Sequence, residues 1–344
     1  MSAEQTGRAR QTARVRRRRR RIWVTGTPWQ RRPQPTPADG PDPYGNPEAE
    51  WMRFDWRPHL HTIELGTASL EPHPGSPVDP TRTEVNYVEL GEGDPVVLVH
   101  GLGGCWQNWL ENILPLARNH RVIVPDLPGF GDSPMPGWEV TISAYGRVLS
   151  MLCEALGAEP AALVGNSMGG FVSAEVTVSE PTLVRKLALV SAAGVTHARM
   201  YRAPVETAGR MARAAAPLAL RYREKALRRP GLRHRVFRNL FYKPNALRPE
   251  LIWEITHPGI HSPALVAALG ALAGYDILDR LEEVEIPTLI VWGQNDMVVP
   301  PTDALEYARR ISHARLEIFA RCGHLPQAER PVRFNRAVEA FLAE

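Results

Sequence analysis

Cysteine is scarce in this chain, and its scarcity excludes one common way of stabilising a fold. Only Cys105, Cys153 and Cys322 occur in 344 residues, and they stand far apart. So sparse and odd-numbered a set argues against a disulfide framework and indicates a reducing compartment, so we expect a cytoplasmic protein. No cysteine or histidine spacing is typical of a zinc site, so we expect no metal ion.

Long hydrophobic runs are also absent. The most apolar stretch, residues 264–275, is short and is interrupted by Gly270 and Gly274, which predicts a core helix rather than a membrane span. The arginine run Arg16–Arg21 is followed by only a brief apolar stretch, residues 22–24, which is too short for the apolar part of a secretion signal. We therefore expect neither a spanning helix nor a secretion signal.

Acidic residues are scarce in two segments. Residues 1–33 carry eleven arginines and one glutamate, and residues 197–280 carry fifteen basic and six acidic side chains. Because the whole chain has a net charge of only +4, the basic character is local and the remainder is strongly acidic. A uniformly basic nucleic-acid binder is therefore excluded.

The first 55 residues predict a disordered tail, because proline, glycine and polar residues dominate and the arginine run repels itself. Two interpretations of this tail stay open. Arg16–Arg21 would contact nucleic acid or an anionic membrane, or the tail is solvated and has no partner.

Eight short segments have the apolar or alternating pattern of strands, and turn signals or helical patterns separate them. They are residues 59–65, 83–90, 95–100, 121–126, 161–165, 184–190, 287–293 and 316–319. Helical patterns occur at residues 106–117, 141–156 and 331–342. This alternation predicts an α/β fold with a mostly parallel central sheet of about eight strands and helices on both faces.

The alternation stops between residues 197 and 280, where only helical patterns occur, separated by proline-containing pairs. We predict that residues 197–280 form an inserted helical cap. The core would then consist of residues 56–196 and 281–344, with residues 1–55 as the tail. A cap over the carboxyl ends of the strands would shape a substrate pocket.

The most informative stretch is Gly165-Asn166-Ser167-Met168-Gly169, a G-x-S-x-G pattern between a predicted strand and a predicted helix. In such a nucleophile elbow, a sharp turn strains the serine backbone and exposes the hydroxyl, and glycines stand where strand and helix approach closely. An ordinary glycine-rich loop is the alternative. The apolar strand before the motif and the helical pattern after it favour the elbow.

A second glycine-rich turn, His100-Gly101-Leu102-Gly103-Gly104, follows the third predicted strand. It would point the Leu102 N–H into a cleft, where it would form a two-donor oxyanion hole with the Met168 N–H. A plain structural turn is the alternative, which the neighbouring elbow disfavours. We interpret His100 and Asp126 as residues that hold loops rather than as catalytic groups.

Asp296 and His324 each stand just past a predicted strand, as Ser167 does. Functional groups gather at the carboxyl ends of strands in open α/β sheets. His324 would take the proton of Ser167, and Asp296 would orient the imidazole and stabilise its charged form. Asp296 could instead be a turn residue, and Asp303 is the nearest substitute.

With these motifs in place, residues 59–344 resemble the α/β-hydrolase superfamily. The chain order Ser, Asp, His is the one expected there. The landmarks that carry the resemblance are residues 100–104, 126–133, 165–170, 292–296 and 323–324. Dehalogenases and epoxide hydrolases of this superfamily use an aspartate nucleophile, whereas Ser167 stands here. The resemblance therefore implies acyl chemistry without a cofactor: attack on a carbonyl, an acyl-enzyme, then water.

Two subgroups of that superfamily look similar to this chain. The elbow, including Asn166, looks like that of the C–C bond hydrolases of aromatic meta-cleavage pathways. Those enzymes commonly carry a tryptophan directly after the catalytic histidine, where Leu325 stands here, and a glycine-proline pattern where Gly103-Gly104 stands. Residues 324–331 look more like those of esterases and related hydrolases.

We therefore expect a serine hydrolase that cleaves a carboxylic ester, or a related acyl bond, of a small to medium apolar substrate. A C–C hydrolase of a meta-cleavage product or an acyltransferase is the alternative among enzymes. A binding module on a hydrolase fold is the non-enzyme alternative, against which the complete Ser, Asp and His set argues. Candidate pocket residues are Gly101, Asn166, Phe241, Trp253 and Leu325, although the two aromatic side chains could instead pack the cap against the core.

Overall fold

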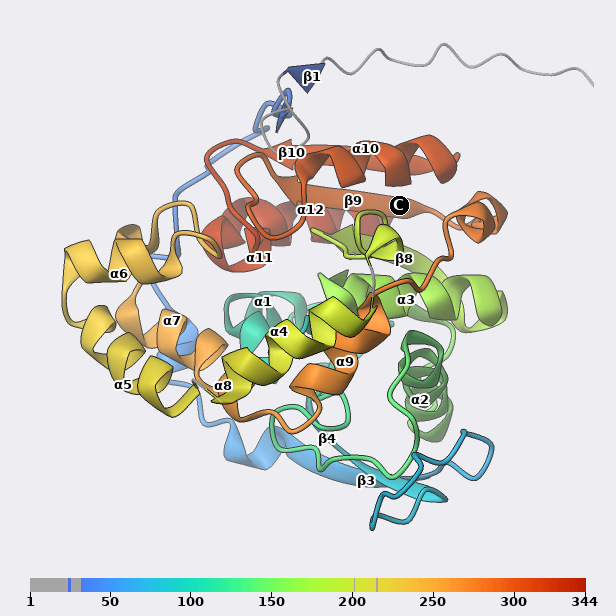
Figure 1. Cartoon of the computed structure of the whole chain (residues 1–344). Helices are drawn as coiled ribbons and strands as arrows, with labels where there is room; N and C mark the ends of the chain where they lie inside the picture. Colours follow the sequence, from blue (N-terminus) through green and yellow to red (C-terminus); the bar gives the residue numbers. More distant parts are fainter. Residues whose placement is uncertain (1–23, 26–31, 201, 215) are drawn as a thin grey trace, which may run out of the picture.

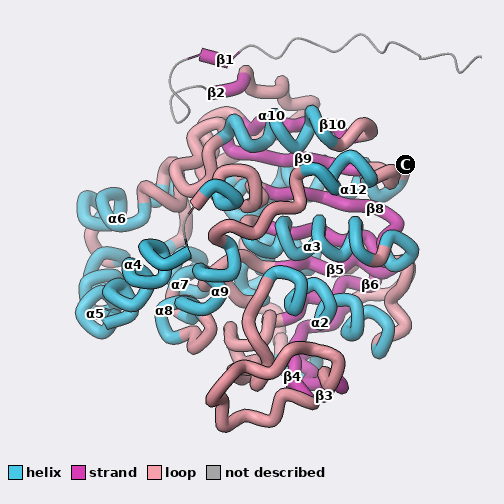
Figure 2. The backbone as a smooth tube through the Cα atoms, turned by 45° about the vertical axis from the view of Figure 1, so that its right-hand side comes forward, coloured by secondary structure: helices cyan, strands magenta, loops and turns pink. Residues whose placement is uncertain are grey.

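The computed structural model describes residues 24–25, 32–200, 202–214 and 216–344. Its centre is an eight-stranded sheet. The strands are β3 (Leu60–Gly66), β4 (Arg82–Leu90), β5 (Pro95–Val99), β6 (Arg121–Pro125), β7 (Ala161–Asn166), β8 (Val184–Val190), β9 (Thr288–Gly293) and β10 (Ala314–Phe319). They lie in the order β10-β9-β8-β7-β5-β6-β4-β3, from top to bottom in Figure 2.

The sheet is mostly parallel. All neighbouring pairs from β6 to β10 run parallel, whereas β4 is antiparallel to both β3 and β6. The predicted mostly parallel sheet of eight strands is therefore confirmed.

The register explains why the central strands carry apolar residues at successive positions. Val97, Leu163 and Leu187 are paired across β5, β7 and β8, and they face one hydrophobic cluster. The next residues along the three strands, Leu98, Val164 and Ala188, face the other cluster. Strands buried on both faces need apolar residues at successive positions.

Helices cover both faces of the sheet (Figure 1). One cluster contains residues of α2 (Ile142–Ala155), α3 (Met168–Ser179) and α10 (Pro301–Arg310). The other contains residues of α1 (Leu110–Leu116), α11 (Pro326–Glu329) and α12 (Pro331–Ala343). Short 3-10 helices connect the larger elements at 50–52, 57–59, 106–109, 181–183, 197–199, 244–246 and 279–283.

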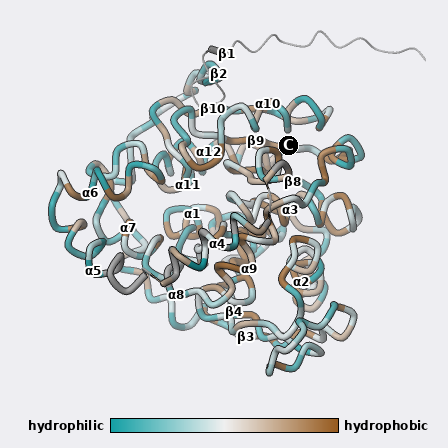
Figure 3. Tube along the Cα trace, viewed as in Figure 1, coloured by the Kyte–Doolittle hydropathy of each residue, from teal (hydrophilic) through white to brown (hydrophobic). Residues whose placement is uncertain are grey.

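Between β8 and β9, the described residues form helices and no strand. The helices are α4 (Arg202–Ala214), α5 (Ala216–Leu227), α6 (Pro230–Phe237), α7 (Pro249–Thr256), α8 (Pro258–His261) and α9 (Leu265–Leu272). α9 is strongly hydrophobic (Figure 3).

This helical segment contacts loops at the carboxyl ends of the strands. The Ala264 N–H donates to the Gly129 carbonyl after β6 at 3.2 Å, and the His324 N–H after β10 donates to the Leu240 carbonyl at 2.9 Å. Gly259 lies so close to Gly103 after β5 that a Cβ there would come within 1.8 Å of the Gly103 oxygen.

The prediction of a disordered tail over residues 1–55 is wrong for its second half. Residues 32–56, which we call the strap, pack along the core. Thr36 exchanges hydrogen bonds with Ile318 of β10, its N–H donating to the carbonyl at 2.8 Å and its Oγ1 accepting from the N–H at 2.9 Å. Trp51 is buried, and its Nε1 donates to Glu111 of α1 at 3.0 Å.

Side chains of the core bind the proline-rich strap between β2 (Arg32–Pro33) and its 3-10 helix, where it has no regular secondary structure. Arg330 donates to the Asp42 carbonyl at 2.9 Å, and Arg333 donates to the Thr36 carbonyl at 3.0 Å. β1 (Val24–Thr25) pairs antiparallel with β2 (Arg32–Pro33) close to α10 (Figure 1). The rest of the predicted tail, including Arg16–Arg21, lies outside the described residues.

Candidate active site

The predicted elbow lies at the carboxyl end of β7. Ser167 stands between β7 and α3 with φ 55° and ψ −119°, a conformation that strains a residue with a side chain. A Cβ at Gly165 would lie 2.3 Å from the Gly169 oxygen, and one at Gly169 would lie 2.3 Å from the Val99 oxygen. Strand and helix therefore close up to a distance that only glycine permits.

Both backbone groups of Ser167, its N–H and its carbonyl, are hydrogen-bonded. Its N–H donates to the Val190 carbonyl of β8 at 2.9 Å, and its carbonyl accepts from the Ala193 N–H at 2.9 Å. Ser167 is 9% exposed as a whole residue, whereas the neighbouring Asn166 is 1% exposed. Both residues are therefore largely buried, and Ser167 keeps the greater exposure.

His324 and Asp296 meet at the ends of β10 and β9. His324 Nδ1 lies 2.8 Å from Asp296 Oδ2, and both side chains are buried. The other carboxylate oxygen of Asp296 accepts from the Val298 and Val299 N–H groups at 2.8 and 2.9 Å. A carboxylate held in this way makes Nδ1 the protonated nitrogen and leaves Nε2 as the acceptor.

The loops of Ser167 and His324 are directly connected, because Asn166 Nδ2 lies 3.4 Å from the His324 carbonyl oxygen. No hydrogen bond joins the Ser167 hydroxyl to His324 within the part of the chain that the structure describes. Such contacts are often long without a substrate and shorten in the reacting complex.

Asp303, the alternative to Asp296, has a different partner. Its carboxylate accepts from the Thr196 N–H and from the Thr196 hydroxyl, both at 2.9 Å. Asp303 therefore fixes the start of the helical segment, and Asp296 is the carboxylate that contacts His324.

The two predicted oxyanion donors lie on either side of Ser167. Met168 is the first residue of α3, and Leu102 follows Gly101, where a Cβ would lie 2.8 Å from Ser167 Cβ. Among the described residues, none accepts a hydrogen bond from either N–H. Two unengaged N–H groups beside the serine are what an oxyanion hole requires.

His100 and Asp126 hold loops, as their interpretation from sequence proposed. His100 Nε2 accepts from the Leu127 N–H at 2.9 Å, and its Nδ1 contacts the Gly101 carbonyl at 2.8 Å. Asp126 accepts from the Trp106 N–H at 2.7 Å and from the Asp132 N–H at 2.9 Å. Burial raises the pKa of Asp126 to about 7.

The pocket residues proposed from sequence do not all gather at Ser167. Gly101 does, as described above. Asn166 donates its amide to the Val190 carbonyl at 3.0 Å and to the His324 loop, so the amide braces the elbow. Phe241 is fully buried, and it belongs with Leu325 to the hydrophobic cluster beneath the helical segment. For Phe241, packing is therefore the role that the structure supports.

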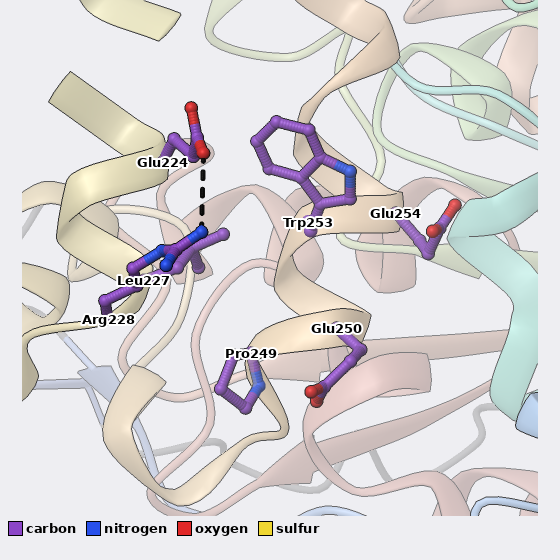
Figure 4. A pocket seen from close by; sticks show the side chains of 7 residues that line it. All are labelled: Glu224, Leu227, Arg228, Pro249, Glu250, Trp253 and Glu254. Carbon is purple, nitrogen blue, oxygen red and sulfur yellow. Dashed lines mark ion pairs between the residues drawn. The ribbon is translucent and has the colours of Figure 1, made fainter. Parts of the chain in front are cut away.

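Trp253 lines a cavity of about 470 Å³ between α5 and α7, shared with Glu224, Arg228 and Glu254 (Figure 4). Its ring also contacts His257, with the ring centroids 4.1 Å apart. The lining of this cavity includes none of the predicted catalytic residues, so the cavity gives no support to a place for Trp253 in the pocket at Ser167, which stays a prediction.

The sequence reasoning missed His197, which opens the helical segment. Burial, with a smaller contribution from the nearby His324, lowers the pKa of His197 to about 4. Its Nδ1 is buried and has no partner among the described residues. No local motif surrounds it, so only the folded arrangement reveals a second imidazole near the Asp296–His324 pair.

Among the described residues, no group of three or more histidine, cysteine, aspartate or glutamate side chains is arranged to hold a metal ion. The same part of the chain contains no helix with the length and apolar character that crossing a membrane requires. The three cysteines are free and buried.

Comparisons with known proteins agree with this geometry. The sequence model of the alpha/beta hydrolase fold matches residues 94–331. The chain is 32% identical over 275 residues to a 2-hydroxy-6-oxo-6-phenylhexa-2,4-dienoate hydrolase of Comamonas testosteroni, covering 76% of this chain and 91% of the relative. It is 32% identical over 281 residues to a 2-hydroxy-6-oxo-2,4-heptadienoate hydrolase of Pseudomonas putida, covering 76% and 93%.

Among solved structures, a thermophilic esterase from Thermogutta terrifontis matches with a TM-score of 0.64 and 27% identity, covering 82% of this chain and 98% of the esterase. The family match spans more than half of the chain and includes both the elbow and His324. The chain therefore belongs to the α/β hydrolase family.

Proposed function

We propose that this chain is a serine hydrolase in which Ser167 attacks a carbonyl carbon. The observation that carries the proposal is the strained Ser167 beside the loop of a buried Asp296–His324 pair. His324 Nε2 takes the hydroxyl proton as the Ser167–carbon bond forms, and the Asp296 carboxylate stabilises the imidazolium. The Leu102 and Met168 N–H groups hold the negative oxygen, and His324 then protonates the leaving fragment.

The substrate class that we propose is a 2-hydroxy-6-oxo-dienoate, cleaved at the carbon–carbon bond beside the 6-oxo group. The two curated relatives, each covered over more than nine-tenths of its length, are named as hydrolases of such compounds. Their similarity favours this class over the carboxylic ester that the sequence put first. Water then releases the acid from Ser167 and restores the hydroxyl.

A carboxylic ester is the second candidate. Leu325 follows His324 directly and is buried, at the position where C–C hydrolases commonly carry tryptophan. The esterase similarity at 27% identity supports the same candidate. Both reactions need the same nucleophile and oxyanion donors, so only the bond that breaks separates them.

The test is a substrate panel with Ser167→Ala beside the wild type. 2-Hydroxy-6-oxo-6-phenylhexa-2,4-dienoate is followed by benzoate release, and p-nitrophenyl esters of increasing acyl length by nitrophenolate release. We expect benzoate release by the wild type and a loss of at least about 10³-fold in the variant, because the nucleophile is removed.

Turnover of the esters alone would replace the C–C proposal by the ester candidate. Equal turnover by Ser167→Ala would contradict the serine mechanism for both. Circular dichroism of the variant checks for a folding defect, which removing a single hydroxyl oxygen from Ser167 should not cause.

A further inference from the structure

Glu329 of α11 is a buried carboxylate that neither the sequence motifs nor the proposed chemistry uses. It is fully buried, and it lies five residues after His324. Ionisable groups are rarely buried without bound partners, because desolvation of the charge is costly. The hydrogen-bond partners of Glu329 come from three parts of the chain that are distant from one another in the sequence.

The first partner is the histidine loop itself. Glu329 Oε1 accepts from the Gly323 N–H at 2.8 Å, directly before His324. The space around Gly323 is filled, since a Cβ there would lie 2.8 Å from Oε1 and 2.9 Å from the Leu240 carbonyl oxygen. The next N–H, that of His324, donates to the same Leu240 carbonyl at 2.9 Å. Glu329 and Leu240 thus hold two successive peptide units at the histidine.

The second partner is the helical segment, and the third is the strap. Glu329 Oε2 accepts from the Tyr242 N–H at 2.7 Å and from the Tyr44 hydroxyl. The Tyr44 hydroxyl in turn accepts from the Lys243 N–H at 2.7 Å. Tyr44 therefore joins the strap to the segment that carries Leu240 and to the carboxylate that holds Gly323.

We propose that Tyr44 of the strap is a positioning residue for His324, and that it acts through the buried carboxylate of Glu329. The inference rests on the proposed role of His324 as the proton acceptor. Without the Tyr44 hydroxyl, Oε2 loses a donor and the Lys243 N–H loses its acceptor. The Gly323 peptide and the Leu240–Tyr242 stretch are then held less firmly, and the imidazole moves relative to Ser167.

The electrostatics agree with this geometry. Burial raises the pKa of Glu329 more than the hydrogen bonds from Tyr44, Tyr242, Gly323 and Leu325 lower it, and the net pKa is about 7. Burial, together with the Glu329 charge, raises the pKa of the Tyr44 hydroxyl, so this group stays protonated and donates. The Arg330 guanidinium lies 5.0 Å from the centroid of the Tyr44 ring and holds that ring in place.

The test compares Tyr44→Phe with Trp51→Phe. The first variant removes only the hydroxyl that contacts Glu329. The second weakens the strap at its other buried anchor, the Glu111 contact, and leaves the surroundings of Glu329 intact. Hydrogen–deuterium exchange of the Gly323 and His324 amides is measured in both, together with kcat and KM on the substrate that the wild type turns over.

For Tyr44→Phe we expect amide exchange about tenfold faster at both positions and a kcat about tenfold lower with KM unchanged, because misplacing a catalytic group slows the chemical step rather than binding. Trp51→Phe should lower the unfolding temperature and change neither quantity. Glu329→Gln, whose amide offers a single acceptor oxygen, should exceed Tyr44→Phe in both effects.

Unchanged exchange and unchanged kcat in Tyr44→Phe would overturn the inference. Equal changes of amide exchange and kcat in Trp51→Phe would also overturn it, because they would show that the strap acts only by stabilising the whole fold. A wild type that turns over no substrate would count against the proposed function alone, because the exchange measurement still decides whether Tyr44 fixes the His324 loop.

Discussion

At the residue scale, His100 shows how two contacts fix a protonation state. Its Nδ1 lies 2.8 Å from the Gly101 carbonyl oxygen, so this nitrogen carries the proton, and Nε2 accepts from the Leu127 N–H. A second proton, on Nε2, would remove the acceptor of the Leu127 N–H and place two N–H groups against each other. Burial also opposes the charged form and lowers the pKa of His100 to about 4.

This lowered pKa predicts how stability depends on pH. The unfolded histidine titrates near its ordinary pKa of 6.5, so below that pH the unfolded state binds a proton that the folded state does not. His100 therefore does not reduce the free energy of unfolding above pH 6.5, where it is neutral in both states. As the pH falls from 6.5 towards 4, the free energy of unfolding decreases. Between pH 7 and pH 4.5 the loss is about 2 kcal/mol.

The measurement is urea unfolding of the wild type and of His100→Gln at several pH values. A glutamine does not titrate, so the unfolding free energy of the variant should fall by about 2 kcal/mol less than that of the wild type over this range. Parallel curves for the two proteins would contradict the pKa shift, whatever the absolute stability of the variant.

Functional residues that belong to a local sequence motif could be predicted from the sequence. Contacts between residues that are far apart in the chain could not. Ser167 was found because the elbow needs glycines two positions away on each side, and His324 because it follows a strand. Tyr44 and Glu329 are 285 positions apart, and no local pattern connects them. Asn166 was placed in the pocket, whereas its amide braces two loops, which only the folded carbonyl positions reveal.

At the element scale, the close approach of α3 to the carboxyl end of β5 predicts a strict need for glycine. A Cβ at Gly169, the second residue of α3, would lie 2.3 Å from the Val99 oxygen and 2.4 Å from the His100 oxygen. Gly169→Ala should therefore cost about 3 kcal/mol or more, because backbone of the central sheet must move.

Gly231 supplies the matched control, since it is the second residue of α6 and a Cβ there meets nothing within 4 Å. Gly231→Ala should be neutral or stabilise the protein by up to about 1 kcal/mol, because alanine favours the helix. Thermal unfolding of both variants checks the pair. Equal, small effects would show that the elbow tolerates a side chain.

Elements with a periodic hydrophobic signal were predictable from sequence. The eight strands of the central sheet appear at the predicted places because the inner strands need apolar residues on both faces, whereas β4, nearer the edge, alternates between buried and exposed residues over its first half. The strap has no such period. It is ordered by contacts that depend on the folded core, such as the Arg330 and Arg333 contacts to its carbonyls, so its proline-rich composition suggested disorder instead.

At the scale of the whole molecule, three parts of the chain converge on the histidine loop. The sheet supplies β10, the helical segment supplies the Leu240 carbonyl, and the strap supplies Tyr44. The family resemblance foresaw the sheet and its motifs but not the strap, which lies before the residues that match the family. A contact of Arg16–Arg21 with nucleic acid or an anionic membrane stays a prediction, since these residues lie outside the described structure.

The central claim is that Ser167 is the activated nucleophile, and covalent labelling tests it independently of the substrate. The wild type and Ser167→Ala are treated with a fluorophosphonate, and the adduct is located by peptide mass spectrometry. We predict one adduct per chain, on Ser167, and none in the variant, because only a serine with an adjacent base and oxyanion donors reacts readily. An unlabelled wild type, or an adduct on another residue, would contradict the account.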